Sequence, residues 1–158
     1  MRTKKLSLYA SALVMLVMAS ACVDAPHYEK FYAFSDQEWP QTIKPKFVVE
    51  VKDTTKWYDI VITLRTTTDY AFSNFWLFLN TKTPTGLTQR EPFQIRIADE
   101  QGRWMGNKTG TLVENHLVFR KRKFPEAGSY VFTLEQGITE KIIDEILDVG
   151  LTMNEHPN

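Results

Sequence analysis

Cysteine is nearly absent from this sequence, since Cys22 is the only one among 158 residues. One cysteine excludes an intramolecular disulfide framework and a zinc site built from paired cysteines. No apolar run reaches the roughly 20 residues that a membrane-spanning helix needs. Basic and acidic side chains balance at 19 each. The overall charge therefore favours neither nucleic acid nor anionic lipid headgroups as a partner.

The N-terminus has the composition of an export signal. Three basic residues precede a largely apolar stretch at 6–19, and the small residues Ala-Ser-Ala lead directly to Cys22. We predict that residues 1–21 are a bacterial lipoprotein signal peptide and that the Cys22 thiol takes a diacylglyceryl group. The alternative is an ordinary signal peptidase site that leaves Cys22 as a free thiol. Acylation is favoured because an unpaired thiol in an exported protein calls for a reason.

Acyl chains on Cys22 would hold the protein on a bilayer without crossing it. Each buried methylene contributes about 0.8 kcal/mol, so two or three chains bind a membrane far more firmly than one. We expect residues 22–27 to be the lipidated cysteine and a short tether, and residues 28–158 to form one domain. Removing the three basic residues of the signal from 19 leaves 16 against 19 acidic residues, a net charge of about −3.

Alternating polar and apolar residues predict β-strands along most of this domain. The strands are expected at 46–52, 57–67, 92–98, 111–121 and 129–136, with 146–153 closing the sheet. The stretch 74–82 is apolar on both faces, as in a central or doubly covered strand. Seven or eight strands at spacings of about ten residues predict an all-β fold, a single antiparallel β-sandwich.

Two further local signals refine this prediction. Helical periodicity occurs only at 139–147, where Thr139 could cap at most one short helix near the C-terminus. Tyr130 follows a turn containing proline and glycine, a position where sandwich folds often tie a tyrosine hydroxyl to nearby backbone.

No arrangement of side chains indicates catalysis or a metal site. His27, His116 and His156 are far apart, and the sequence has no phosphate-binding glycine loop or nucleophile motif. No pair of carboxylates is marked out for acid and base roles. We expect no enzyme activity, cofactor, metal or small-molecule substrate, and a hydrolase is the least favoured function.

Two groups of residues are candidates for binding. The basic cluster consists of Arg120, Lys121, Arg122 and Lys123. It is either a patch that docks a partner or a solvated hairpin edge, and the edge is favoured. The exposed aromatic candidates are Trp57, Trp76 and Trp104. They could stack on sugar rings in a surface glycan-binding module, although their apolar neighbours favour core packing.

Several stretches of the sequence are distinctive in combination. They are 28–39, 51–79, 98–112, 124–137 and "DVGL" at 148–151. The most specific parts are a turn with Asp99, Gly102, Arg103 and Trp104 and a strand end with Glu135, Gln136 and Gly137. Together, from Cys22 nearly to the C-terminus, the chain resembles the gliding-motility lipoprotein family of the GldH type, from Bacteroidetes.

The resemblance implies a lipid-anchored, non-enzymatic protein of the cell envelope that supports gliding motility and/or the associated type IX secretion machinery. Its implied partners are the membrane, through acyl chains on Cys22, and other envelope proteins of motility or secretion. Only Cys22 carries a defined chemical role over from the family. The outer membrane is favoured over the inner one, and the leaflet is left open.

The distinctive turn has two possible interpretations. It is either a docking surface or a tight turn that closes a strand pair. Gly102 and Gly106 would permit turn conformations closed to other residues, and Asp99 could cap the turn through its side chain. Arg103 could stack on Trp104 or form an ion pair.

Overall fold

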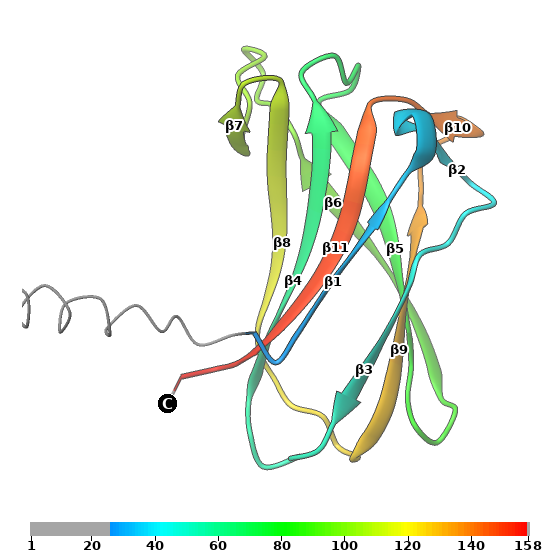
Figure 1. Ribbon diagram of the computed structural model, residues 1–158, viewed down its shortest axis with the longest axis vertical. Helices are drawn as coiled ribbons and strands as arrows, with labels where there is room; N and C mark the ends of the chain where they lie inside the picture. The colour runs from blue at the N-terminus through cyan, green and yellow to red at the C-terminus, as the bar shows by residue number, and fades with distance from the viewer. Residues whose placement is uncertain (1–25, 158) are drawn as a thin grey trace, which may run out of the picture.

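Two antiparallel β-sheets lie face to face in the computed structural model, which describes residues 26–157 (Figure 1). The five-stranded sheet has the order β1-β11-β4-β8-β7. Its strands are β1 (Tyr28–Ala33), β11 (Ile146–Glu155), β4 (Tyr58–Thr67), β8 (Leu112–Arg122) and β7 (Asn107–Thr109). The four-stranded sheet has the order β3-β9-β5-β6. Its strands are β3 (Lys46–Val51), β9 (Gly128–Gln136), β5 (Asn74–Lys82) and β6 (Thr88–Arg96).

The predicted antiparallel β-sandwich is therefore confirmed. Eight of its strands have six residues or more, which matches the predicted number. The other strands are β7, with three residues, and the ribbon of β2 (Trp39–Pro40) with β10 (Ile142–Ile143). Such short strands carry too few residues for an alternating pattern to appear in the sequence.

The segment 139–147 contains no helix. Ile142 pairs with Pro40 in the ribbon, and Ile146 begins β11. Ile143 and Ile146 are buried, and Glu145 between them has a φ of 67°, which breaks the strand. The isoleucine spacing suits a helix, but pairing with a distant segment decides the local structure. The one helical turn described, η2 (Ser35–Gln37), lies near the start of the domain.

The alternation predicted within the strands is confirmed where one face is buried. Tyr58, Ile60, Ile62 and Leu64 of β4 all lie in the core, as the sequence pattern indicates. Tyr130 is buried, and its hydroxyl donates to the Glu126 carbonyl at 3.1 Å. β5 is central, between β9 and β6, but its outer face is open to solvent, so the doubly covered alternative is wrong.

Tryptophan burial differs from the expectation. Trp57 is 44% exposed and Trp76 is 42% exposed, so neither is a core residue. Trp104 is half-buried and packs against the core. The fully buried tryptophan is Trp39, which the sequence pattern did not single out.

Trp39 joins the ribbon to the sandwich core. Its ring stacks on Phe34 at 4.7 Å and on Phe75 at 5.4 Å between centroids. Its indole Nε1 donates to the Ile43 carbonyl at 2.9 Å, which satisfies its one buried polar group. Aromatic pairs of this kind stabilise a core beyond the area that they bury.

None of the helices among residues 26–157 combines the length and the apolar character that crossing a membrane requires.

We expect Trp39→Ala to destabilise the domain by about 3–5 kcal/mol, because the change leaves a cavity between two aromatic rings. Urea unfolding, followed by circular dichroism, measures this loss. Trp57→Ala is the matched control, since it removes the same atoms from an exposed position and should cost much less. Equal losses in the two variants would show that Trp39 is not a packing centre.

Candidate functional site

The loop between β6 and β7 holds the distinctive turn. Asp99 Oδ1 accepts hydrogen bonds from the backbone N–H groups of Gln101 at 3.0 Å and Arg103 at 2.9 Å. Arg103 Nε donates to Asp99 Oδ2 at 2.7 Å. The turn is thus organised around one carboxylate. The backbone N–H of Arg103, more than any other donor, holds the pKa of Asp99 below its usual value.

The neighbours of Asp99 take distinct roles in this loop. Arg103 forms an ion pair with Asp99, and its side chain is 76% exposed. Trp104 forms an isolated backbone bridge with Ala98, which closes the base of the loop. Gly102 has a φ of 74°, a conformation that favours glycine.

Gly106 is required for a different reason from the predicted one. Its φ is not in the left-handed region, so it provides no special turn conformation. A Cβ added there would collide with the Glu114 backbone oxygen and lie 2.6 Å from Asn115 Oδ1. Gly106 therefore allows the loop to approach β8 closely.

The loop overhangs two adjoining open hollows. The first is ≈ 500 Å³ and is lined by Gln94, Arg96 and Met105 together with loop residues such as Asp99. The second is ≈ 340 Å³, shares those three residues and extends to Glu114 and His116. Together they form a groove, here called the loop groove, between the edge of the four-stranded sheet and β8. Met105 is 54% exposed beside it.

A row of charged side chains crosses the outer face of the five-stranded sheet. Arg65 Nε donates to Glu114 Oε2 at 2.7 Å, and its Nη1 lies 3.6 Å from Asp148 Oδ2. The Arg65 guanidinium also lies over the Phe31 ring, 4.4 Å from its centroid. Arg65 holds the pKa of Glu114 below its usual value, whereas burial raises the pKa of Asp148. This row ties β1, β11, β4 and β8 together.

The basic cluster lies at the end of β8. Its four side chains, Arg120, Lys121, Arg122 and Lys123, are exposed. The ion pairs found among residues 26–157 include none of them. A bulge occurs here, where the Lys121 N–H donates to Asp59 Oδ1 at 2.9 Å.

Cations of the cluster also lie against aromatic rings. Lys123 Nζ is 5.3 Å from the centre of the Trp57 ring, and Arg122 Cζ is 5.4 Å from that of Phe119. The cluster therefore combines positive charge with an exposed indole, as well as forming a strand edge.

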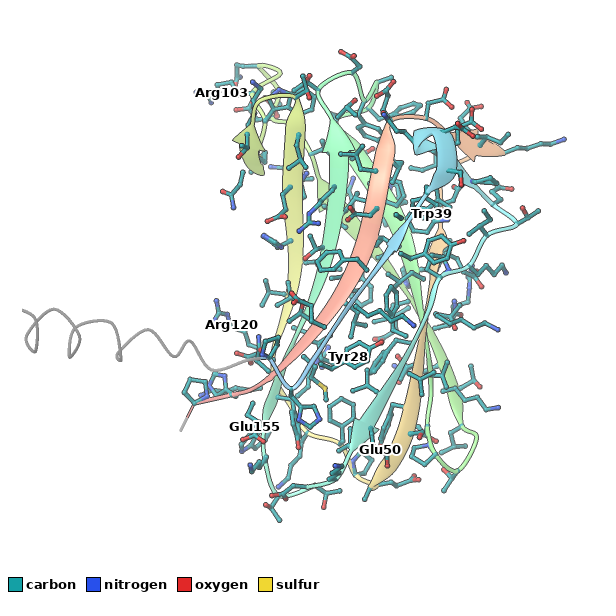
Figure 2. The ribbon with its side chains drawn as sticks, viewed as in Figure 1. Tyr28, Trp39, Glu50, Arg103, Arg120 and Glu155 are labelled. Atoms are coloured by element: carbon teal, nitrogen blue, oxygen red, sulfur yellow. The ribbon has the colours of Figure 1, made fainter. Side chains whose placement is uncertain are left out.

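The β6–β7 loop and the basic cluster lie toward opposite ends of β8. β7 pairs with the first residues of β8, where Thr109 faces Leu112. The basic cluster begins at Arg120, near the other end of this 11-residue strand, whereas the loop groove reaches along β8 as far as Leu117. Three residue steps of about 3.3 Å each, or roughly 10 Å along the strand, therefore separate the groove from the cluster. Figure 2 shows Arg103 at the top of the molecule and Arg120 about halfway down, above Glu155.

The exposed tryptophans do not form one aromatic surface. Trp76 lies on the outer face of β5, whereas Trp57 directly precedes β4 in the other sheet. Beside Trp76, the Arg90 guanidinium covers Phe78 at 3.5 Å from its ring centre. Trp76 is therefore a single exposed ring on its sheet face, flanked across the pair by Gln94.

No group of three or more His, Cys, Asp or Glu residues suited to a metal ion occurs within residues 26–157. Cys22, the predicted acyl acceptor, lies outside the described residues, as do the predicted signal peptide and most of the predicted tether.

The model of the GldH lipoprotein family matches residues 26–153, which include almost all of the described domain. The chain belongs to the GldH lipoprotein family. The resemblance described from the sequence is thereby confirmed. As a member of the GldH lipoprotein family, the chain is a membrane-anchored lipoprotein of the cell envelope.

Curated relatives carry the same family name. The gliding motility lipoprotein GldH homolog of Christiangramia forsetii is 27% identical over 153 residues, which cover 90% of this chain and 92% of the relative. Gliding motility lipoprotein GldH of Flavobacterium johnsoniae is 27% identical over 125 residues, or 74% of this chain and 77% of the relative. Among solved structures, one of the infectious bursal disease virus Gx strain has a TM-score of 0.35 and 10% identity, covering 83% of this chain and 33% of that one.

We expect Gly106→Ala to destabilise the domain by about 1–3 kcal/mol, because the new methyl group overlaps the β8 backbone. Gly102→Asn is the control, since asparagine tolerates the left-handed conformation and Gly102 has open space around it. Urea unfolding of both variants measures the difference. A smaller loss in Gly106→Ala than in Gly102→Asn would contradict the close packing of the loop on β8.

Proposed function

We propose that this protein is a lipid-anchored, non-enzymatic component of the cell envelope that supports gliding motility and the associated type IX secretion machinery. The observation that carries the proposal is the family match over residues 26–153. Two relatives that bear the name gliding motility lipoprotein support it. Its role is to hold or position other envelope proteins at the membrane, with the outer membrane favoured.

The arrangement of the domain suits such a role. The loop groove lies beside the first half of β8, and the basic cluster lies at the end of this strand, which is the end of the sheet where the chain enters the domain. A protein held by acyl chains is confined to a surface, so its effective concentration for neighbouring proteins is high. Modest contacts at the loop groove would then be sufficient to retain a partner.

The loop groove has features of a protein contact. It combines an exposed methionine, Met105, with polar groups from Gln94 and Arg96. Arginine and methionine are both enriched in protein interfaces. The carboxylate of Asp99 keeps the overhanging loop in one conformation, which lowers the entropy lost on binding.

The anchor can be tested separately from the partner. We expect the protein isolated from membranes of its host to carry acyl chains on Cys22, detected by mass spectrometry of its N-terminal peptide. Cys22→Ala should move the protein from the membrane fraction to the soluble fraction, because the remaining chain has no apolar run long enough to span a bilayer. An unmodified Cys22, or unchanged fractionation of the variant, would contradict acylation.

The partner is tested by affinity purification of the tagged protein from its own host in mild detergent, with co-purifying proteins identified by mass spectrometry. We expect motility or type IX secretion proteins to be recovered. Met105→Glu should reduce their recovery at least about tenfold, or by about 1.4 kcal/mol in binding free energy, since it places a charge in the proposed interface.

Val48→Glu is the control for that experiment. Val48 is 55% exposed, nearly the same as Met105, but it lies on the outer face of the four-stranded sheet. Equal recovery from both variants would exclude the loop groove as the contact. Failure of the wild-type protein to recover any such component would overturn the proposed partner role.

A glycan-binding module is the second candidate function, and the exposure of Trp76 is the observation that favours it. An indole beside polar groups can stack on a sugar ring. A binding assay with envelope polysaccharide and Trp76→Ala would test this function if no protein partner is recovered.

A further inference from the structure

The N-terminal end of the domain lies at the same end of the five-stranded sheet as the basic cluster. The His27 ring contacts the Tyr58 ring at 5.7 Å between centroids, and His27 Nε2 donates to the Glu50 carbonyl at 3.0 Å. Tyr58 is paired in register with Arg122 and follows Trp57 directly. The first described residues therefore lie at the same end of the sheet as the exposed indole and the cations, with β11 and β4 between β1 and β8.

The chain between the anchor and this end is short. Four residue steps separate Cys22 from Pro26, and a fully extended chain spans at most about 3.6 Å per residue. If Cys22 carries the acyl chains, as the proposed function holds, Pro26 lies no more than about 14 Å from the anchored cysteine. The basic cluster is thereby kept near the bilayer surface.

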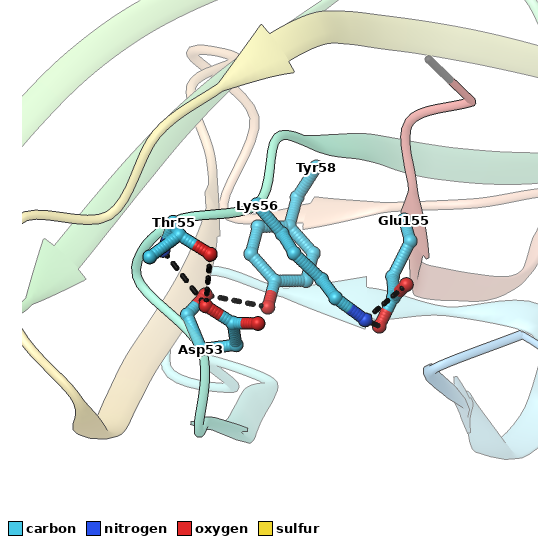
Figure 3. A network of polar contacts seen from close by, with 5 residues as sticks. All are labelled: Asp53, Thr55, Lys56, Tyr58 and Glu155. Atoms are coloured by element: carbon cyan, nitrogen blue, oxygen red, sulfur yellow. Dashed lines mark hydrogen bonds and ion pairs between the residues drawn. The ribbon is translucent and has the colours of Figure 1, made fainter.

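The acidic side chains around the cluster already have other partners. Glu155 accepts from Lys56 Nζ at 2.7 Å, and Asp59 lies 2.9 Å from His156 Nδ1. Figure 3 shows the first of these pairs beside the Asp53 turn, where Asp53 Oδ1 accepts from Thr55. None of the four exposed cations, Arg120, Lys121, Arg122 and Lys123, forms an ion pair within residues 26–157.

Trp57 adds the second element of a membrane contact. It is exposed and lies against Lys123. Tryptophan is enriched at the headgroup level of membranes, because its ring is apolar and its N–H is polar. Lysine and arginine next to it are attracted to anionic headgroups.

We propose that Trp57 and the basic cluster form a membrane-contact face that binds the anionic phospholipid headgroups of the leaflet that holds the anchor. This inference rests on the proposed lipid anchor and adds an orientation to it. The domain is held at two points, by acyl chains on Cys22 and by this face, so it does not rotate freely on its tether. The net charge of about −3 on the mature chain does not prevent such binding, because interactions between charges more than about 10 Å apart are screened by salt and the local charge decides.

The test uses the mature chain with Cys22→Ser, so that no acyl chain contributes to binding. Co-sedimentation is measured with vesicles of phosphatidylcholine alone and with vesicles that also contain phosphatidylglycerol. We expect binding to the mixed vesicles, weakened by added salt, and little binding to phosphatidylcholine alone. Replacing all four cluster cations by glutamine should weaken binding about 100-fold or more, and Trp57→Ala should weaken it further.

The matched control replaces Lys46, Lys82, Lys108 and Lys141 by glutamine. These are four exposed cations outside the loop groove, and the change in net charge is the same. Retained binding in the control supports a defined face. Equal loss in both variants, or no preference of the wild-type protein for the mixed vesicles, would overturn it.

Failure of this inference is distinguishable from failure of the proposed function. The vesicle assay contains neither acyl chains nor partner proteins, so its result does not depend on either of them. If the cluster variant loses co-purifying proteins in the host while the wild-type protein ignores anionic vesicles, the cluster binds a protein and the membrane-contact face is wrong.

Discussion

The structure depends on the position of β11 between β1 and β4. This last strand of the chain pairs with the first strand on one side and with a central strand on the other. β1 has no other neighbour in its sheet. The N-terminal segment that leads to Cys22 is therefore attached to the domain through the C-terminal strand. Gly150 in β11 permits this attachment, because a Cβ there would overlap the Phe31 ring of β1.

The side chains around this junction explain why the pairing is specific. Arg65 from β4 lies over the Phe31 ring and forms ion pairs with Glu114 of β8 and Asp148 of β11. One guanidinium thus contacts residues of three neighbouring strands. Because a register slip of one residue would turn these side chains to the other face, the row helps to fix the pairing. The charged groups of this row form ion pairs with one another within the sheet, whereas those of the basic cluster do not.

The sequence predicts this fold wherever local pattern and tertiary environment agree. β4 has one buried face, and its alternation from Tyr58 to Leu64 is visible without coordinates. The turn at Asp99 is likewise local, since aspartate, glycine and arginine lie within five residues. Prediction from the sequence fails where contacts with segments distant in the sequence determine the local structure. Ile142 and Ile146 have a helical spacing but meet strands that are far away in sequence. The Arg65 row connects four strands that no local pattern relates. Trp39 is buried by Phe34 and Phe75, which its immediate neighbours do not reveal.

The junction of β1 with β11 also has a mechanical consequence. β1 leaves the anchor end at Tyr28 and runs along β11 to Ala33, pairing at six positions. A force that pulls the anchor away from a partner at the far end of the molecule acts along β1 and across its hydrogen bonds. The bonds are then loaded together in shear, and not opened one after another from an end. With the proposed anchor and partner in place, this edge strand of only six residues would be the connection that bears the tension between them.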